Sequence, residues 1–134
     1  PFVCHCMHQA TVRMDGEKMS KSLGNLVFAS DLSILWDPRA IRLACLVHHY
    51  RESWEWSGQL MPEASARLQR WVAAGVGTGA LGEVRAALDE DLDTPGAVAA
   101  IDAAAERGEG VSEAALLLGV RTDRPVEVYP EHLS

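Results

Sequence analysis

Two combinations of aspartate and proline, Asp37-Pro38 and Asp93-Thr94-Pro95, indicate where helices begin in this sequence. An aspartate side chain accepts hydrogen bonds from the unpaired backbone N–H groups at a helix start, and a proline in the first turn sacrifices no hydrogen bond. Apolar residues follow both combinations at helical spacing. We therefore expect one helix from residue 38 to about residue 50, buried on more than one side, and an alanine-rich helix over residues 95–105.

Three further segments have apolar residues at helical spacing: residues 62–74, 81–92 and 112–118. Pro62 is predicted to be the first residue of its helix, because a proline is best tolerated there. The glycines at 75, 77, 79 and 82 predict a flexible connection between the first two of these helices.

The predicted fold class is mainly α, with a helical bundle over residues 37–120. Residues 121–134 contain two prolines and no periodicity, so we expect an irregular, loose tail. Residues 1–36 differ from both parts. Residues 2–14 have the composition of a strand, and Asp15-Gly16 is a turn signal, which places the polar run that follows on a loop.

That polar run holds the two lysines of the chain, Lys18 and Lys21, whereas the other ten basic residues are arginine. A lysine ammonium is a compact, rotatable charge that suits a polyphosphate whose shape changes during reaction. Ser20, Ser22 and Gly24 add hydroxyl groups and a backbone that can approach an anion closely. The pattern favours phosphate binding, and the alternative for so short a run is a solvated loop.

The segment Lys18-Met19-Ser20-Lys21-Ser22 is identical to the KMSKS signature of the class I aminoacyl-tRNA synthetases and their relatives. Its flanks, Asp15-Gly16-Glu17 and Leu23-Gly24-Asn25, resemble the cysteine-activating branch of that family. Four other segments resemble the same branch in order and spacing: Met7-His8, Asp37-Pro38-x-x-Ile41-Arg42, His49-Tyr50-Arg51 and Asp91-Leu92-Asp93-Thr94-Pro95. Within the branch, Trp54-Glu55-Trp56 resembles the mycothiol ligases more than the cysteinyl-tRNA synthetases, and the resemblance covers about residues 2–120.

The resemblance implies that residues 1–36 are the C-terminal edge, a strand plus the KMSKS loop, of a class I Rossmann-type catalytic domain. In such enzymes the first half of that domain carries a H-I-G-H-like element, and its middle carries the ligands of a zinc ion that binds the cysteine thiolate. Neither element is found in this sequence. We therefore expect the chain to be a C-terminal fragment that lacks an N-terminal catalytic half and is inactive alone.

The resemblance also implies a reaction, in which cysteine and ATP with magnesium form cysteinyl-adenylate. Lys21 and Lys18 would be the catalytic residues, with Lys21 the larger contributor, and Lys18, Met19, Ser20, Lys21 and Ser22 would bind the triphosphate. A mycothiol ligase transfers the cysteine to the amine of glucosaminyl-inositol, and a cysteinyl-tRNA synthetase transfers it to tRNA. A third possibility is a non-catalytic helical interaction module that retains a relic of the loop.

Charge argues against the tRNA alternative. The net charge is −7, and residues 80–134 contain 12 acidic but 4 basic side chains, which is a poor surface for a nucleic-acid backbone. The sequence also stops soon after its last predicted helix, where a tRNA-dependent relative would continue into an anticodon-binding region. Three cysteines give no disulfide framework, and no apolar span is long enough for a bilayer, so we expect a reducing, cytoplasmic setting without membrane contact.

Four possible metal ligands lie close together near the start of the chain: Cys4, His5, Cys6 and His8. They could form a metal site, and the alternative is a half-buried strand. A structural zinc site spaces its paired ligands by two to four residues and needs a second pair elsewhere. On a strand, Cys4 and Cys6 would face away from His5, so we expect a half-buried strand and no metal ligands in this chain. The acidic run Asp89-Glu90-Asp91 is similarly expected to be a solvated face.

His48 and His49 invite an acid–base interpretation, but no partner carboxylate is identifiable from the sequence. We expect them to close a helix C-terminus, whose partial negative charge favours a protonatable ring. Trp54 and Trp56 alternate as on a strand, so both rings would face one side. We expect them to fill a seam between two parts of the molecule in preference to lining a pocket.

Overall fold

The structure is a computed structural model of the chain and describes residues 2–127. Its helices are α1 (Ala29–Leu35), α2 (Pro38–Leu46), α3 (Leu60–Ala74), α4 (Leu81–Asp89), α5 (Thr94–Glu106) and α6 (Ser112–Leu117). Its strands are β1 (Val12–Met14), β2 (Glu17–Lys18) and β3 (Trp54–Glu55). The prediction of a mainly α fold is therefore confirmed.

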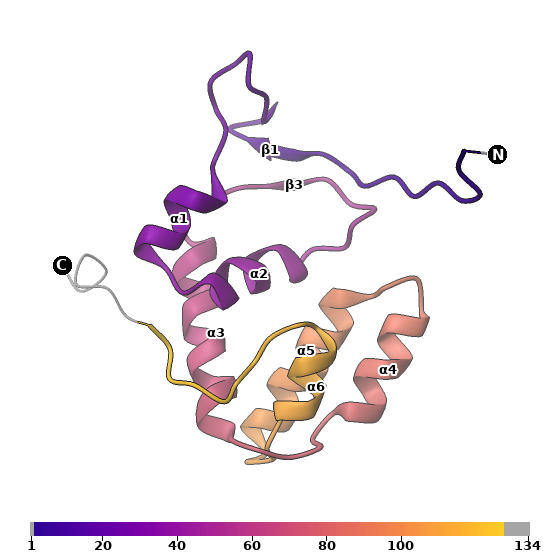
Figure 1. Cartoon of the computed structure of the whole chain (residues 1–134), viewed down its shortest axis with the longest axis vertical. Helices are drawn as coiled ribbons and strands as arrows, with labels where there is room; N and C mark the ends of the chain where they lie inside the picture. The colour runs from indigo at the N-terminus through magenta and orange to yellow at the C-terminus, as the bar shows by residue number, and fades with distance from the viewer. Residues whose placement is uncertain (1, 128–134) are drawn as a thin grey trace.

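The small sheet lies at one end of the molecule, with α1 and α2 next to it (Figure 1). The sheet has the order β2-β1-β3, with β1 antiparallel to β2 and parallel to β3. The lysine loop extends from this end, whereas α4, α5 and α6 lie at the other, with α2 and α3 between them (Figure 1). The bundle therefore supports the loop end without covering it.

Both predicted aspartate caps are present. The side chain of Asp37 accepts a hydrogen bond from the backbone N–H of Arg39 at 2.9 Å, and Pro38 is the first residue of α2. Asp93 accepts one from the N–H of Gly96 at 3.0 Å at the start of α5. These starts are readable from sequence because a cap is a contact between residues only two or three positions apart.

The core forms where α3 crosses α5 and α2. Leu68 and Trp71 of α3 are fully buried, as is Ile101 of α5, and the small residues Ala97 and Ala104 let the helices approach closely. The indole N–H of Trp71 donates to Asp102 at 2.7 Å, so this large side chain is buried without an unpaired polar atom. The alanine-rich helix predicted over residues 95–105 is therefore present, as part of α5.

Three helix boundaries differ from the predictions. Pro62 is the third residue of α3, not the first, because none of the N–H groups in a first turn has a partner within the helix. Helix α2 ends at Leu46, not near residue 50. Complete burial is confined to Ala40, Leu43 and Ala44, and Arg42 and Cys45 on the other side are exposed, so α2 is buried on one side and not on more than one. Helix α4 ends at Asp89, before two residues with left-handed backbones at 91 and 92.

The predicted strand over residues 2–14 is shorter than expected. Regular pairing covers Val12–Met14, because β2 and β3 are two residues long and offer ladder partners to this stretch. Strand composition cannot create a strand where no neighbouring edge is presented. The turn at Asp15-Gly16 is confirmed, and both of its residues have positive φ angles.

The glycine connection between α3 and α4 is packed, which corrects the prediction that it is flexible. The N–H of Gly79 donates to the carbonyl oxygen of Gly110 at 2.8 Å, and Gly77 lies so close that a Cβ atom there would be 2.7 Å from the same oxygen. Gly82 is not part of the connection, because it is the second residue of α4. The glycines at 77, 79 and 110 permit two backbone segments to touch.

Substituting Gly110 tests this contact. A Cβ atom at this position would overlap the backbone carbonyl of Val76, so we expect Gly110→Ala to lower the free energy of unfolding by about 1–3 kcal/mol or more. Gly82→Ala is the matched control, because nothing lies within 4 Å of the added atom. Urea unfolding of the three proteins measures the difference, and equal stability of Gly110→Ala and wild type would contradict the tight packing.

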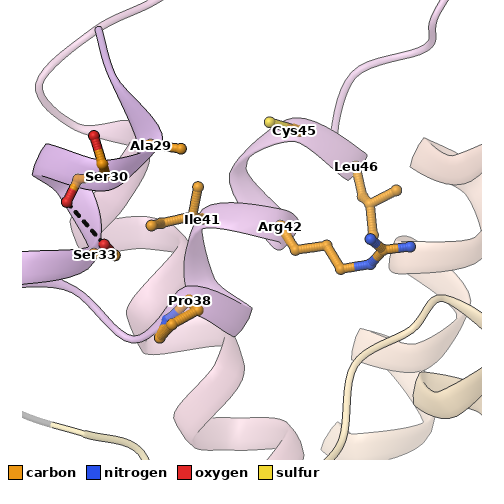
Figure 2. Close-up of a pocket in the computed structure, with 8 residues that line it drawn as sticks. All are labelled: Ala29, Ser30, Ser33, Pro38, Ile41, Arg42, Cys45 and Leu46. Carbon is orange, nitrogen blue, oxygen red and sulfur yellow. Dashed lines mark hydrogen bonds between the residues drawn. The ribbon is translucent and has the colours of Figure 1, made fainter.

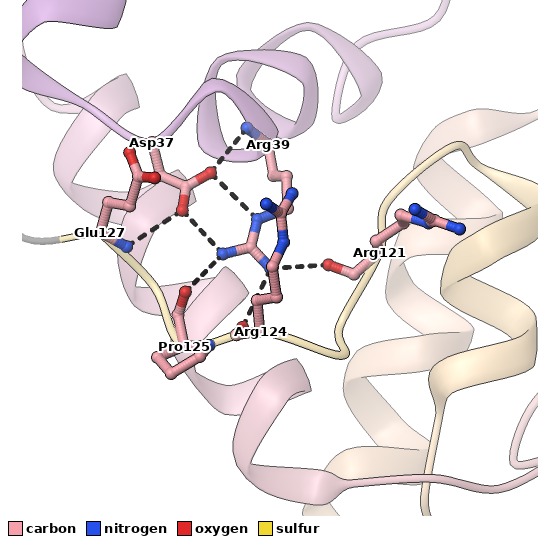
Figure 3. A network of polar contacts seen from close by, with 6 residues as sticks. All are labelled: Asp37, Arg39, Arg121, Arg124, Pro125 and Glu127. Carbon is pink, nitrogen blue, oxygen red and sulfur yellow. Dashed lines mark hydrogen bonds and ion pairs between the residues drawn. The ribbon is translucent and has the colours of Figure 1, made fainter.

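The segment after α6 is bound to the bundle, so the prediction of a loose tail is wrong for residues 121–127. The guanidinium of Arg39 donates to the carbonyl oxygens of Arg121, Arg124 and Pro125 at 2.7, 3.1 and 2.8 Å (Figure 3). The N–H of Glu127 donates to Asp37 at 3.0 Å. The rest of the predicted tail, residues 128–134, lies outside the described residues.

Candidate functional site

The lysine motif begins on a strand and continues into a turn. Lys18 is the last residue of β2, and the turn that follows contains Lys21. The loop placement predicted for the whole motif is therefore wrong for Lys18. Both lysine residues are exposed, whereas Met19 and Ser20 between them are half-buried, and the N–H of Met19 is bound to the carbonyl of Val12 at 3.1 Å. The motif thus presents its charges to solvent from a backbone that is anchored to the sheet.

Short-range hydrogen bonds shape the turn. The N–H of Gly24 donates to the carbonyl of Lys21 at 3.3 Å, and the N–H of Leu23 donates to the hydroxyl of Ser20 at 3.3 Å. The hydroxyls of Ser20 and Ser22 lie 3.2 Å apart. Gly24 has a φ of 69°, a left-handed conformation that glycine adopts without strain and that returns the chain toward the sheet.

Asn25 joins the far side of this turn to β2. Its side-chain oxygen accepts the N–H of Ser20 at 2.8 Å, and its side-chain nitrogen donates to the carbonyl of Lys18 at 3.2 Å. Asn25 belongs to the motif in the sequence, but no role was predicted for it. The one feature of the sequence that could have indicated this contact is an asparagine seven residues after a lysine that ends a strand.

The sheet adds a third cation, which the sequence pattern did not predict. Arg13 of β1 is in register with Lys18 of β2 and with Glu55 of β3, so the three exposed side chains share one face of the sheet. Val12, Met14 and Trp54 occupy the other face, which is half-buried. The face that carries Lys18 is therefore charged, with a carboxylate at its far side.

Two segments matched in the sequence, His49-Tyr50-Arg51 and the run from residue 91 to residue 95, are in direct contact. Asp91 accepts a hydrogen bond from the hydroxyl of Tyr50 at 2.5 Å. It also forms an ion pair with Arg51 at 2.8 Å. Its backbone carbonyl accepts from Nε2 of His49 at 3.0 Å. The hydrogen bond from Tyr50, with the charge of Arg51, keeps the pKa of Asp91 below its usual value. This acidic residue therefore connects two segments, which is more than the solvated face that was predicted.

His48 closes the C-terminal end of α2, as predicted. Its Nδ1 donates to the carbonyl of Ala44 at 3.0 Å, and its ring stacks on Trp54 with centroids 3.8 Å apart. Burial lowers the pKa of His48, and this effect outweighs the backbone hydrogen bonds that favour protonation. The neutral ring is stabilised because the indole replaces water on one of its faces.

Trp54 and Trp56 face the same side, as expected from their alternation, with ring centroids 6.1 Å apart. Trp56 packs against the core, and Trp54 lies where β3 meets the end of α2. The expected seam is therefore present between the sheet and the bundle. Trp54 also lines a cavity of about 350 Å³ there, together with Met7, Tyr50 and Thr94.

The candidate metal ligands at the start of the chain lie apart from the bundle. Cys4 and Cys6 are exposed free thiols, and His5 and His8 are exposed as well, so the expected half-buried strand is not formed there. Within residues 2–127, no three His, Cys, Asp or Glu side chains are arranged to hold a metal ion. The described residues therefore do not fit the zinc ion that the family resemblance implies.

A largely apolar groove of about 550 Å³ separates α1 from α2 (Figure 2). Ser30, Ser33, Ile41, Arg42 and Cys45 line it, and the hydroxyl of Ser33 is bound to the carbonyl of Ser30 at 2.8 Å. The Nε of Arg42 donates to the carbonyl of Leu118 at 2.6 Å, and burial raises the pKa of the Cys45 thiol. The groove therefore presents a protonated thiol and an arginine engaged by the backbone, which is not the chemistry of a nucleophile.

Comparison with known proteins agrees with this geometry. A model of the catalytic domain of class I tRNA synthetases (C) matches residues 1–66, which contain the sheet, the lysine loop, α1 and α2. The chain is therefore similar to the class I (C) tRNA synthetases over residues 1–66, and its similarity to curated relatives covers most of its length.

Three curated relatives of the chain carry the name L-cysteine:1D-myo-inositol 2-amino-2-deoxy-alpha-D-glucopyranoside ligase. The protein of Streptosporangium roseum is 50% identical over 113 residues, 80% of this chain and 28% of the relative. That of Nocardiopsis dassonvillei is 54% identical over 107 residues, 75% of the chain and 26% of the relative. That of Clavibacter sepedonicus is 45% identical over 144 aligned positions, 92% of the chain and 35% of the relative. The chain thus spans about a third or less of the relatives it matches.

None of the helices in the described residues combines the length and the apolar character needed to cross a bilayer.

Proposed function

We propose that this chain supplies the KMSKS loop and its helical support to an ATP-dependent cysteine ligase, and that the other substrate sites lie in a catalytic half outside this chain. The observation that carries the proposal is the exposure of Lys18, at the end of β2, and of Lys21, in the turn that follows, on a backbone anchored to the sheet. The names of the relatives support cysteine as the activated substrate. In this proposal residues 1–36 are the edge of the catalytic domain, residues 37–120 are its brace, and the complete enzyme works in the cytoplasm.

The proposed reaction has two steps. A carboxylate oxygen of cysteine attacks the α-phosphorus of ATP, the bond between the α- and β-phosphates breaks, and pyrophosphate leaves with its magnesium. The amine of glucosaminyl-inositol then attacks the carbonyl carbon of the adenylate, loses a proton and forms an amide as AMP departs. Lys18 and Lys21 would neutralise the charge that accumulates on the leaving pyrophosphate, which is where preorganised cations contribute most.

The choice of acceptor separates this proposal from the alternative of a cysteinyl-tRNA synthetase, which the matched catalytic domain also supports. We expect a polypeptide with the complete catalytic domain to exchange pyrophosphate into ATP only when cysteine is present. With glucosaminyl-inositol it should release AMP and form the amide, and with tRNA it should form no ester. Cysteinyl-tRNA formation without the amide would select the alternative, and absence of cysteine-dependent exchange would reject both.

A further inference from the structure

The side chain of Asn25 links two points of the lysine loop by hydrogen bonds. Its oxygen accepts the N–H of Ser20 at 2.8 Å and its nitrogen donates to the carbonyl of Lys18 at 3.2 Å. These groups flank Met19 on either side, so one side chain holds the backbone on both sides of the residue between β2 and the turn. The amide orientation is fixed by this pair of contacts, since a reversed amide would face donor with donor and acceptor with acceptor.

The other contacts of the loop are distributed differently. The bonds that join Ser20 to Ser22, Leu23 to Ser20 and Gly24 to Lys21 connect residues within the turn to one another. The bond from Met19 to Val12 connects the end of β2 to β1. Asn25 connects the turn to β2 itself, and β2 carries Lys18 while the turn carries Lys21. Its two bonds therefore relate the backbone positions of the two lysines.

We propose that Asn25 is a positioning residue that sets the separation of Lys18 and Lys21 and so prepares both ammonium groups for one polyphosphate. This inference rests on the proposed function. Asn25 carries no charge and adds none to the site, so its effect would operate through the lysines. Electrostatic stabilisation depends on groups that already point to where charge develops, and a displacement of about 1 Å can cost about 10²-fold in rate.

The test uses Asn25→Ala in a polypeptide with the complete catalytic domain. We expect kcat for cysteine-dependent pyrophosphate exchange to fall about 10-fold or more, with a smaller change in the KM for ATP, because the interaction acts in the transition state. Asn25→Asp keeps the acceptor for Ser20 but loses the donor to Lys18, so its kcat should also fall. Gln69→Ala removes an exposed amide from α3 and is the matched control.

Hydrogen exchange supplies a readout that does not depend on activity. We expect the amide of Ser20 to be protected in the wild-type protein and to lose that protection in Asn25→Ala. A wild-type Ser20 amide that exchanges as fast as an unstructured one would overturn the inference even if the variant failed to fold. An Asn25→Ala enzyme with wild-type kcat, beside a Lys21→Ala enzyme that is strongly impaired, would overturn it and leave the proposed function standing. Unimpaired activity in both variants would reject the proposed function itself.

Discussion

Replacing Lys21 by alanine is expected to lower kcat for cysteine-dependent pyrophosphate exchange by about 10²-fold or more in a polypeptide with the complete catalytic domain. The reason is the loss of one cation at the site where negative charge grows as pyrophosphate departs. Lys18→Ala should act in the same direction but less strongly, because Lys18 shares its face of the sheet with Arg13, a second cation that remains. Initial-rate measurements over a range of ATP concentrations separate kcat from KM.

The stability of the Lys21→Ala protein should be nearly unchanged. Lys21 is exposed in a turn, and substitutions of that kind alter the free energy of unfolding by about 0.5 kcal/mol or less. Arg85→Ala, which removes an exposed charge from α4 at the far end of the molecule, is the control for a general effect of net charge. Equal kcat and equal ATP affinity before and after Lys21→Ala would instead favour a helical interaction module with a relic loop.

Glu55 places a negative charge on the face of the sheet that carries Lys18. It is in register with Arg13, so its carboxylate lies on the charged face together with Lys18. Its oxygen also accepts the N–H of Gly16 at 3.3 Å, in the turn that precedes the lysines. A negative charge on this face opposes the binding of an anion, which makes the face a balance of cations and a carboxylate instead of a uniformly positive surface.

Local signals in the sequence predicted much of the fold. The starts of α2 and α5 follow from Asp37 and Asp93, because capping involves residues adjacent in sequence. Pro62 correctly indicated the first turn of α3 but not its first residue, since proline is compatible with several positions in a first turn. A helix start is therefore predicted well where a cap and a proline occur together, and less well where a proline occurs alone.

Contacts between distant backbone segments could not be predicted. The glycines at 77 and 79 meet Gly110, more than 30 positions later, and nothing in the spacing of glycines shows which segment will pack on them. Arg39 binds the backbone carbonyls of residues 121, 124 and 125, and backbone acceptors leave no trace in side-chain composition. Both segments were therefore predicted to be mobile, although each is held by hydrogen bonds.

The residues of the candidate site also fall into those that a local sequence pattern predicts and those that depend on the fold. The identity of the lysine motif came from sequence, because five identical residues in a row are a local pattern. The places of Arg13 and Asn25 depend on the register of β1 with β2 and on the path of the turn. A residue that acts through geometry becomes visible only when the chain is folded.

The network around Asp37 should contribute strongly to the stability of the contact between α2 and residues 121–127. Asp37 is 3% exposed and Arg39 is 12% exposed, and their charged groups are 2.7 Å apart (Figure 3). Asp37→Ala removes the cap of α2 and leaves the guanidinium of Arg39 without its carboxylate. Since breaking one side of a buried pair typically costs about 3–5 kcal/mol, we expect a loss of that order in urea unfolding of the 134-residue chain.

Glu52→Ala is the control, because Glu52 is an exposed carboxylate in the loop before β3 and should change stability by about 0.5 kcal/mol or less. Asp37→Asn should lose less than Asp37→Ala, because an asparagine oxygen can still accept the N–H of Arg39. A Asp37→Ala protein as stable as the Glu52→Ala protein would show that the network adds nothing to folding.

The advantage of the ionised Asp37 should depend on pH in a defined direction. Burial alone would raise the pKa of this carboxyl group, but hydrogen bonds from the Arg39 side chain and from the N–H groups of Glu127 and Arg39 bring it below the ordinary value of 3.8. Because the folded pKa is lower than the unfolded one, the stabilisation is complete above the unfolded pKa and is lost as pH falls through the folded pKa. The difference in unfolding free energy between wild type and Asp37→Asn should therefore be constant from pH 7 to pH 5 and shrink below about pH 4. A difference that does not change with pH would mean that the carboxylate is not held in its ionised form by Arg39.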